Sequence, residues 1–486
     1  TEIPFTARIQ QNIGPLVKFD YPINDSVMTV SQIRGARPSP DGRRVVFAAL
    51  DRLWVADLPA ESGNQLEDFP IVRDARRLTT STDVEHAPSW SPDGEAIAYV
   101  TWNDSVGGDI YRVDSNGGEP VRLTSTAAFF DKVSYTQDGS RILAVRGSKM
   151  HRMRMLEDFG NHSPTAELEY VWLPSEGGEP TRITWVGRGA TEQGRNAPNF
   201  GPDPERIYVW AGSDGLLSMR YDGTDIRTVV KVTAPNVDGG GGAPDEVVLS
   251  PDGRRAIVRA NRNVFLITVP PVGGEAPTVS VSSSSTVPTR RLTKVGGDFV
   301  GWSYDGTTAH YSIGRSLFEY DLETGDALVA DSVVLARAEA ATADKSQAED
   351  PQGDDADDGE VAYEAARFDF EITQLKDKPR GTVVLSGARL ITMRGKEVIS
   401  RGDIVVRDNR IIAVGASGTV PIPEGAEVRD MAGKTILPGF VDIHAHTWVA
   451  WGVHRTQVSQ FLAQLAYGVT TQRDPQTSTE DILSYV

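Results

Sequence analysis

Cysteine is absent from this chain of 486 residues, and histidine is scarce, with seven copies. Without thiols the chain can form neither disulfides nor thiolate metal sites, so imidazole and carboxylate groups remain as metal ligands. The absence does not fix the cellular compartment, because exported bacterial proteins often lack cysteine too.

Long apolar runs and an excess of positive charge are also missing. No stretch of about 18 apolar residues occurs, so the sequence predicts no membrane-spanning helix. The 49 basic residues are outnumbered by 67 acidic ones, which gives a formal net charge of -18. We therefore expect no nucleic acid partner, because phosphate binding needs a basic surface. The start at Thr1 has neither an initiator Met nor a basic segment followed by an apolar one, which predicts an internal or processed start.

A turn motif repeats along the first two thirds of the chain. Ser-Pro-Asp-Gly stands at 39–42, 91–94 and 250–253, and weaker copies stand at 136–139, 201–204 and 303–306. Proline fixes φ, aspartate bonds its own backbone and glycine accepts positive φ, so each copy predicts a tight turn. Around the second copy, strands are expected at 87–90, before the turn, and at 96–102, 109–114 and 120–124, after it. Four antiparallel strands in about 40 residues are typical of one propeller blade.

The six copies predict a mainly β fold, with a propeller of about six blades over residues 1–335. The fourth strand of the last blade is poorly signalled, so we expect the N-terminal segment 29–34 to close the ring. With Trp-Ser-Pro-Asp-Gly at 90–94, the repeats resemble the TolB-like β-propellers over most of residues 35–330. That resemblance implies a fold and not an activity, because propellers serve many functions.

An acidic segment follows the repeats. Between positions 339 and 364 there are ten acidic residues and one lysine. We predict a flexible linker at 336–366, because such a composition cannot bury enough apolar surface to fold. A cation site is the weaker alternative, since carboxylates on a disordered run cannot preform a cage.

A second architecture begins at residue 367. Strands are expected at 382–391, 403–407 and 410–415, within a small β-sandwich part at 367–437. The chain then continues into a buried strand at 437–446, a helix at 457–467 and a strand at 469–471. Strand, helix and strand form one βαβ unit, which is the repeating element of a (β/α)₈ barrel, and we assign 438–486 to the start of such a barrel.

The strand at 437–446 carries two histidines. Because side chains alternate along a strand, Phe440, Asp442, His444 and His446 are expected on one face. The two imidazoles are then one pleat apart, which suits two ligands of one divalent ion. In a (β/α)₈ barrel the carboxyl ends of the strands form the active site, which is where this pair stands.

Several short motifs beyond residue 380 together resemble the metal-dependent amidohydrolase superfamily, closest to its imidazolonepropionase-like and dipeptidase-like branch. They are Gly-Ala-Arg-Leu-Ile at 387–391, Gly-Asp-Ile-Val-Val at 402–406, Arg-Ile-Ile-Ala-Val-Gly at 410–415, Leu-Pro-Gly-Phe-Val-Asp-Ile-His-Ala-His at 437–446 and Tyr-Gly-Val-Thr-Thr at 467–471. The resemblance implies a β-sandwich before a barrel, hydrolysis of amide, cyclic amide or peptide-like C–N bonds, and one or two divalent ions, zinc foremost. It also implies that His444 and His446 are metal ligands.

Other residues near the pair take their roles from the same resemblance. Asp442 is expected to pack in the barrel or to support a ligand. Trp448, Trp451 and His454 either line a substrate pocket or only pack the loop after the strand. The remaining ligands and the aspartate that transfers protons come from later strands in the family, so no catalytic residue is assigned in this sequence.

The sequence therefore predicts part of a longer metal-dependent hydrolase, completed by further residues of the same polypeptide or by a companion chain. The order of propeller, sandwich and barrel resembles exported bacterial family members, which implies a periplasmic or extracellular location. Expected partners are a small-molecule or peptide substrate, and a homo-oligomer stays open. The rival interpretation is a propeller-based binding or scaffold protein in which the barrel fragment is not catalytic.

Overall fold

The computed structural model falls into two compact units. One comprises residues 30–372 and 438–486, and the other comprises 1–29 and 373–437. The description below covers the chain outside residues 1–25, 61–68, 155–167, 187–197, 236–241, 243, 272, 283–284, 286, 332–362, 446–451, 457 and 476–486. No described helix is both long and apolar enough to cross a membrane.

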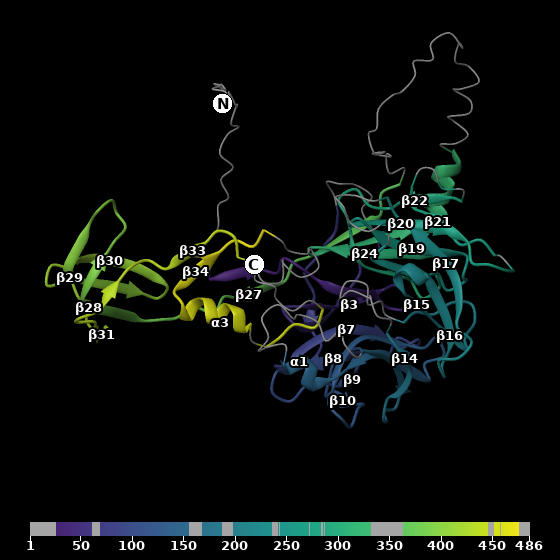
Figure 1. Cartoon of the computed structure of the whole chain (residues 1–486), viewed down its shortest axis with the longest axis horizontal. Coiled ribbons are helices and arrows are strands. Elements are labelled where there is room, and N and C mark those ends of the chain that lie inside the picture. Colours follow the sequence, from purple (N-terminus) through teal and green to yellow (C-terminus); the bar gives the residue numbers. More distant parts are fainter. Residues whose placement is uncertain are drawn as a thin grey trace, which may run out of the picture. The chain divides into compact units, whose positions relative to one another are not determined.

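The larger unit is built mainly from four-stranded antiparallel meanders that follow one another along the chain (Figure 1). The first sheet contains β2 (Arg34–Pro38), β3 (Arg44–Ala49), β4 (Arg52–Asp57) and β6 (Arg76–Arg77). The second sheet contains β7 (Val84–Trp90), β8 (Ala96–Trp102), β9 (Ile110–Asp114) and β10 (Val121–Arg122). The third sheet contains β11 (Phe129–Tyr135), β12 (Arg141–Gly147), β13 (Glu169–Pro174) and β14 (Thr181–Trp185). The short helix α1 (Lys149–Arg154) lies between β12 and β13.

Three further sheets complete the succession. The fourth sheet contains β15 (Arg206–Trp210), β16 (Leu216–Arg220), β17 (Arg227–Thr233) and β21 (Thr278–Ser280). The fifth sheet contains β18 (Glu246–Leu249), β19 (Arg255–Ala260), β20 (Asn263–Thr268) and β22 (Thr289–Arg291). The last sheet contains β23 (Asp298–Trp302), β24 (Thr308–Ile313), β25 (Ser316–Asp321), β26 (Ala366–Phe370) and β5 (Ile71–Val72). A single 3₁₀ turn, η3 (Gly212–Asp214), precedes β16. The mainly β fold predicted from the turns is confirmed. The antiparallel meander pattern holds except that β21 joins β17 in parallel and β5 joins β26 in parallel.

The repeated turns have the geometry that their composition predicts. In the second copy, the Ser91 hydroxyl donates to Asp93 Oδ1 at 2.5 Å, and the Glu95 backbone N–H donates to the same oxygen at 3.0 Å. Gly94 has φ of 74°, a left-handed conformation that glycine adopts without strain. A Cβ on Gly94 would stand 3.7 Å from the Pro40 ring, so one turn packs against the turn of the neighbouring sheet.

The predicted ring closure by segment 29–34 is wrong. The fourth strand of the last sheet is β26, which pairs antiparallel with β25 and parallel with β5. β1 (Val27–Thr29) instead pairs with β27 (Thr373–Leu375) in the other unit. β26 fits the sheet because Phe368 and Phe370 are buried in the seam cluster with the first sheet, and the buried Asp369 carboxylate accepts hydrogen bonds from Ser316 and Arg367.

The predicted domain boundaries change accordingly. The sequence ends the linker at 366 and starts the sandwich part at 367, whereas the structure places 366–370 in the propeller and the division between units at 372–373. Residues 332–362 of the predicted linker lie outside the described residues. Residues 26–29 were assigned to the propeller within 1–335, but they belong to the smaller unit, where β1 pairs with β27.

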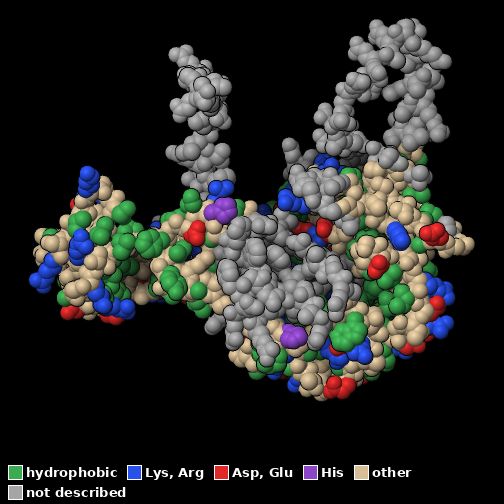
Figure 2. Space-filling view, in the orientation of Figure 1, with side chains coloured by type: hydrophobic (Ala, Val, Ile, Leu, Met, Phe, Trp, Pro, Cys, Tyr) green, Lys and Arg blue, Asp and Glu red, His purple; other side chains and the backbone are tan. Residues whose placement is uncertain are grey.

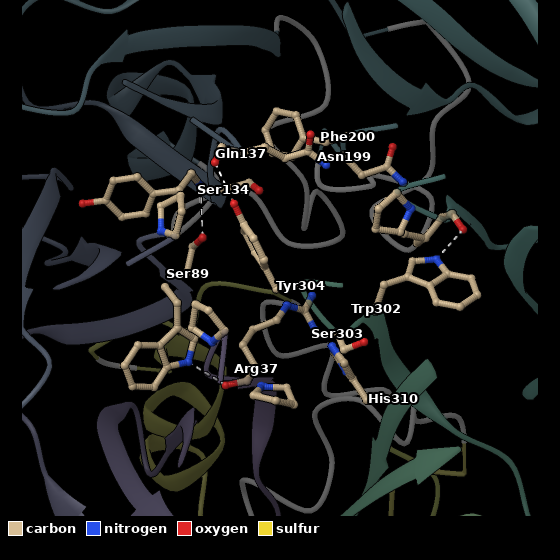
Figure 3. A pocket seen from close by; sticks show the side chains of 18 of the residues that line it. Arg37, Ser89, Ser134, Gln137, Asn199, Phe200, Trp302, Ser303, Tyr304 and His310 are labelled. Atoms are coloured by element: carbon tan, nitrogen blue, oxygen red, sulfur yellow. Dashed lines mark hydrogen bonds between the residues drawn. The ribbon is translucent and has the colours of Figure 1, made fainter. Parts of the chain in front are cut away.

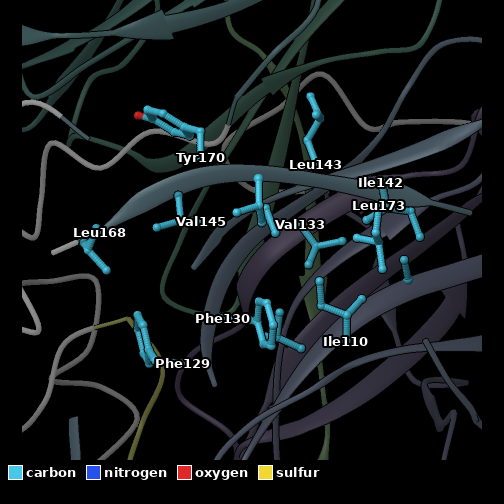
Figure 4. Close-up of a cluster of buried hydrophobic side chains, with 14 of the residues drawn as sticks. Ile110, Phe129, Phe130, Val133, Ile142, Leu143, Val145, Leu168, Tyr170 and Leu173 are labelled. Carbon is cyan, nitrogen blue, oxygen red and sulfur yellow. The ribbon is translucent and has the colours of Figure 1, made fainter. Parts of the chain in front are cut away.

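Apolar side chains pack between adjacent sheets. One cluster joins the first sheet to the last, with the rings of Phe47 and Phe370 centred 4.8 Å apart. The succession of sheets therefore closes on itself as a β-propeller. A larger cluster fills the space between the second and third sheets and includes Phe130, Ile142 and Leu173 (Figure 4).

Besides the β1–β27 pair, the described part of the smaller unit contains a sheet of five strands. They are β28 (Thr382–Ile391), β29 (Val398–Arg407), β30 (Arg410–Ala416), β31 (Glu427–Asp430) and β32 (Thr435–Ile436). The predicted strands at 382–391, 403–407 and 410–415 are confirmed. Asp403 joins neighbouring segments, because its Oδ1 accepts hydrogen bonds from Ser386 and Ser417, each at 2.8 Å. Several apolar side chains of this unit are exposed, Ile411 among them at 65%. Figure 2 shows hydrophobic side chains on the surface of this unit.

The C-terminal part of the larger unit contains the predicted βαβ order. β33 (Phe440–Asp442) pairs in parallel with β34 (Val469–Gln472), and α3 (Ser459–Ala466) lies between them in sequence. The strand was expected to be buried, yet Phe440, Val441 and Ile443 are more than half exposed. No residue of α3 is buried, so within the described residues this helix does not cover the strand.

Candidate functional site

His444 lies two residues beyond the end of β33, at the carboxyl edge of the parallel strand pair. Its backbone N–H donates to Asp442 Oδ1 at 3.0 Å, and the Asp442 carbonyl accepts from the Arg473 N–H at 2.8 Å. The Ala445 N–H donates to the Arg473 carbonyl at 3.0 Å. These bonds fix the backbone around an exposed imidazole.

The other half of the predicted ligand pair is not described. His446, Trp448 and Trp451 lie outside the described residues, so their predicted roles are untested. Among the described residues, no group of three or more histidine or carboxylate side chains is arranged to hold a metal ion. Two imidazoles suit a zinc ion chemically, but a complete site needs further donors.

His454 has a definite place in the structure. It belongs to the segment 452–456, called the docking segment below, which lies against the propeller. His454 is 1% exposed, and its Nδ1 is 2.5 Å from Asp51 Oδ1. Of the two roles predicted for His454, pocket lining or loop packing, the described contacts are those of packing.

Three neighbours of His454 in the docking segment also contact the propeller. The Gly452 carbonyl accepts from Arg34 Nη2 at 2.5 Å, and the Val453 carbonyl accepts from Arg152 Nη2. The Thr456 hydroxyl donates to Asp104 Oδ2 at 2.6 Å. The Val453 side chain is 1% exposed and joins the apolar cluster between the second and third sheets.

Charged groups surround this contact. Burial alone would raise the pKa of Asp51, but the adjacent His454, Arg34 and Arg52 lower it on balance. Burial holds the pKa of nearby His86 well below its ordinary value, and the positive charges of Arg34 and Lys132 act in the same direction. The Nε2 of His86 lies 3.6 Å from Asp131 Oδ1.

A separate pocket of about 210 Å³ lies in the propeller, at the ends of the strands that carry the repeated turns (Figure 3). Tyr304 spans it, since its hydroxyl donates to the Gln137 carbonyl at 2.7 Å. Proline and aromatic side chains line much of the walls, together with polar residues that include Gln137, Asn199 and Glu246. The indole N–H groups of Trp90 and Trp302 already donate to backbone carbonyls, so these residues offer the pocket only their faces.

Two nitrogen-bearing side chains line this pocket, half-buried Arg37 and buried His310. Arg37 Nη1 donates to the Ala36 and Phe299 carbonyls at 3.1 and 3.2 Å, while its Nε and Nη2 make no hydrogen bond with described residues. His310 is 1% exposed, and neither ring nitrogen has a hydrogen-bond partner in the described part of the chain. Burial, with Arg37 close by, holds the pKa of His310 well below its ordinary value. Sequence reasoning missed both residues, because neither stands in a recognisable motif.

No family model matches the chain. Short stretches are similar to imidazolonepropionases: 40% identity over 63 residues with that of Sphingopyxis alaskensis, 42% over 52 residues with that of Acidiphilium cryptum, and 39% over 72 residues with that of Mesorhizobium japonicum. These matches cover 13%, 11% and 14% of this chain. The chain spans 15%, 13% and 18% of the length of these relatives.

Among solved structures, TolB from Agrobacterium tumefaciens is similar at a TM-score of 0.37 and 16% identity, covering 57% of this chain and 87% of that one. TolB from Acinetobacter baumannii has a TM-score of 0.37 at 16% identity, covering 61% of this chain and 60% of that one. The short imidazolonepropionase matches agree with the motifs that resemble the amidohydrolase superfamily.

Proposed function

We propose that this chain is part of a metal-dependent amidohydrolase that hydrolyses amide, cyclic amide or peptide-like C–N bonds. The observation that carries the proposal is the position of His444, directly after β33 and at the carboxyl edge of a parallel βαβ unit. Active sites of (β/α)₈ barrels lie at that edge. The short similarity to imidazolonepropionases supports the same class of reaction.

The proposed architecture is a six-bladed propeller followed by a sandwich part and the first strand, helix and strand of the barrel. Six sheets of four or five strands within 34–370 support the blade count. Exposed apolar side chains on β33 and α3, including Phe440, Val441 and Leu465, favour completion of the barrel by further protein. We propose an exported location by resemblance, with a small molecule or peptide as substrate.

In this proposal His444 and His446 hold a divalent ion, zinc foremost, with further ligands and a proton-transferring aspartate from later barrel strands. Such an ion would lower the pKa of a bound water and polarise the substrate carbonyl. Asp442 would position His444, because its carboxylate accepts the hydrogen bond from the His444 backbone. Trp448 and Trp451 would border the substrate.

Metal analysis of the intact native protein tests the proposal. We expect about one or two divalent ions per chain and hydrolysis of amide substrates, since a bound ion generates the nucleophile in such sites. Removal of the ion by a chelator should abolish hydrolysis, and added zinc should restore it. Full hydrolysis by metal-free protein would contradict the proposal.

The pocket at Arg37 favours a second function, the binding of a small aromatic carboxylate by the propeller. The half-buried Arg37 guanidinium, whose Nε and Nη2 make no hydrogen bond with described residues, would recognise a carboxylate through two parallel hydrogen bonds, in competition with Glu246, which lines the same pocket. The faces of Trp90 and Trp302 would contact the flat apolar part of the ligand. This function requires no catalysis and corresponds to the binding-protein interpretation of the sequence.

Calorimetric titration with benzoate and its neutral analogue benzamide tests this second function. We expect benzoate to bind and benzamide not to bind, and Arg37→Gln to weaken benzoate by roughly 10- to 100-fold through the loss of a charge-assisted contact. Arg43→Gln, which removes an exposed guanidinium outside the pocket, should leave affinity unchanged. Equal binding of benzoate and benzamide would refute carboxylate recognition.

A further inference from the structure

We infer that the propeller pocket lined by Arg37 and Glu246 binds a zwitterion, namely a single α-amino acid with an aromatic side chain. The carboxylate-binding function proposed above is the premise, because Arg37 takes the ligand carboxylate in both cases. The new element is a contact between the ligand ammonium and Glu246, which turns a competing carboxylate of the protein into a partner.

Arg37 and Glu246 place opposite charges on the walls of one pocket. Arg37 comes from β2 of the first sheet (Figure 3), and Glu246 comes from β18 of the fifth. Burial lowers the pKa of Arg37 and the Glu246 carboxylate raises it, so the two groups are close enough to interact. No ion pair joins them in the described part of the chain. A ligand carboxylate alone would be repelled by Glu246, whereas a ligand with both charges would be attracted at both ends.

The Glu246 carboxylate has room for a further partner. Its side chain is 17% exposed, and its Oε2 lies 3.9 Å from Arg259 Nε, which is too long for a hydrogen bond. Arg259 Nη1 lies closer to Asp298 Oδ1, at 3.1 Å. Among the described residues nothing donates a hydrogen bond to the Glu246 carboxylate. An ammonium group carries three N–H donors and would satisfy it.

His310 adds a buried polar group that faces the same ligand position. It is 1% exposed, and its ring nitrogens have no hydrogen-bond partner within the described residues. A Cβ on Gly301 would stand 2.7 Å from His310 Nε2 and 3.3 Å from Arg37 Nη1, so the two side chains meet where the strand carries no side chain. A buried polar group without a partner costs free energy. A carboxylate bound to Arg37 would accept the imidazole N–H and remove that cost.

The walls and the volume favour one aromatic amino acid over a peptide. Trp90 and Trp302 present the faces of their indoles, because both indole N–H groups already donate to backbone carbonyls. An aromatic ring packs well against such faces. The volume of about 210 Å³ is smaller than the roughly 300–1,000 Å³ of sites for drug-sized ligands, so the pocket suits a small molecule.

Calorimetric titration of the full native protein compares three ligands with the same ring and a similar chain. L-Phenylalanine carries both charges, 3-phenylpropionate lacks the ammonium, and phenethylamine lacks the carboxylate. We expect phenylalanine to bind roughly 10- to 100-fold more tightly than either of the others, because each of them lacks one charge-assisted contact.

Two substitutions assign the contacts to residues. Glu246→Gln should weaken phenylalanine by roughly 10- to 100-fold and should not weaken 3-phenylpropionate, which has no ammonium to lose. His310→Phe keeps an aromatic ring but removes both nitrogens, so it should weaken phenylalanine and 3-phenylpropionate by similar factors. Glu205→Gln, which removes an exposed carboxylate outside the pocket, should change neither affinity.

The outcomes separate this inference from its premise. Equal affinities of wild-type protein for phenylalanine and 3-phenylpropionate would overturn the ammonium contact and leave the carboxylate-binding function standing. Phenethylamine binding as tightly as phenylalanine would overturn the role of Arg37 and both functions with it, as would failure of benzoate and all three ligands to bind. If Glu246→Gln does not fold, the three ligands on wild-type protein still decide, because that comparison needs no variant.

Discussion

Replacing His444 and His446 together by alanine should remove the bound divalent metal and lower kcat/KM on the order of 1,000-fold or more in the intact protein. The reason is additive loss of donors. A site that loses two imidazoles has too few ligands to retain the ion, and loss of a supporting residue alone costs 10- to 100-fold in comparable sites. Metal content by elemental analysis and steady-state kinetics measure the two effects.

The position of His444 gives this prediction its structural basis. Its backbone is fixed by Asp442 and by pairing with the segment after β34, while its imidazole is exposed and able to meet other ligands. Truncation of His444 to alanine therefore removes no buried packing. The thermal midpoint of unfolding should stay close to that of metal-free wild-type protein.

A matched control separates the metal site from other histidines. His151→Ala removes a half-buried imidazole on α1, in the propeller, and should leave metal content and kcat/KM unchanged. Retained metal with normal hydrolysis in the double variant would refute the assignment of the pair. If the double variant keeps the metal but loses hydrolysis, the ion has other ligands, and His444 and His446 contribute to catalysis in another way.

Local patterns were sufficient to predict the meanders. A proline, an aspartate and a glycine in a row specify a turn within a few residues, as the bonds around Asp93 show. Alternating apolar residues then place the flanking strands. The βαβ order after residue 438 was predictable for the same reason, because helix and strand periodicities differ.

Long-range pairings were not predictable from local patterns. β26 pairs with β25, although the acidic segment separates them in the sequence. The five residues of β26 indicate a strand, but their pattern does not tell whether that strand belongs to a propeller or to a sandwich. The contact between His454 and Asp51 joins positions 403 residues apart, and no signal near either residue reveals the other. His310 likewise gains its buried environment from neighbours that the sequence does not bring together.

Truncating Phe370 to alanine should destabilise the propeller by about 3–5 kcal/mol, the range for a fully buried phenylalanine. Phe370 is fully buried in the last sheet, and its ring packs on Phe47 of the first sheet with centroids 4.8 Å apart. The lost contact lies where the ring of sheets closes. The cost is a large fraction of the 5–15 kcal/mol that typically stabilises a folded domain.

The sites of increased hydrogen exchange show whether Phe370→Ala weakens only the seam, the contact between the first and last sheets, or the whole propeller. Because Phe370 joins the first and last sheets, hydrogen exchange should rise most in β3 and β26 and least in β11 and β12, which pack elsewhere. Phe318→Ala is the matched comparison, since this half-buried ring stacks on Tyr311 at 5.0 Å within the last sheet and away from the seam. It should cost less free energy and leave exchange in β3 unchanged. A loss below about 1 kcal/mol for Phe370→Ala, far under the range for core phenylalanines, would show that the seam does not limit stability. An equal rise of exchange in all sheets would instead show that the propeller unfolds as one cooperative unit, with no weaker point where its ends meet.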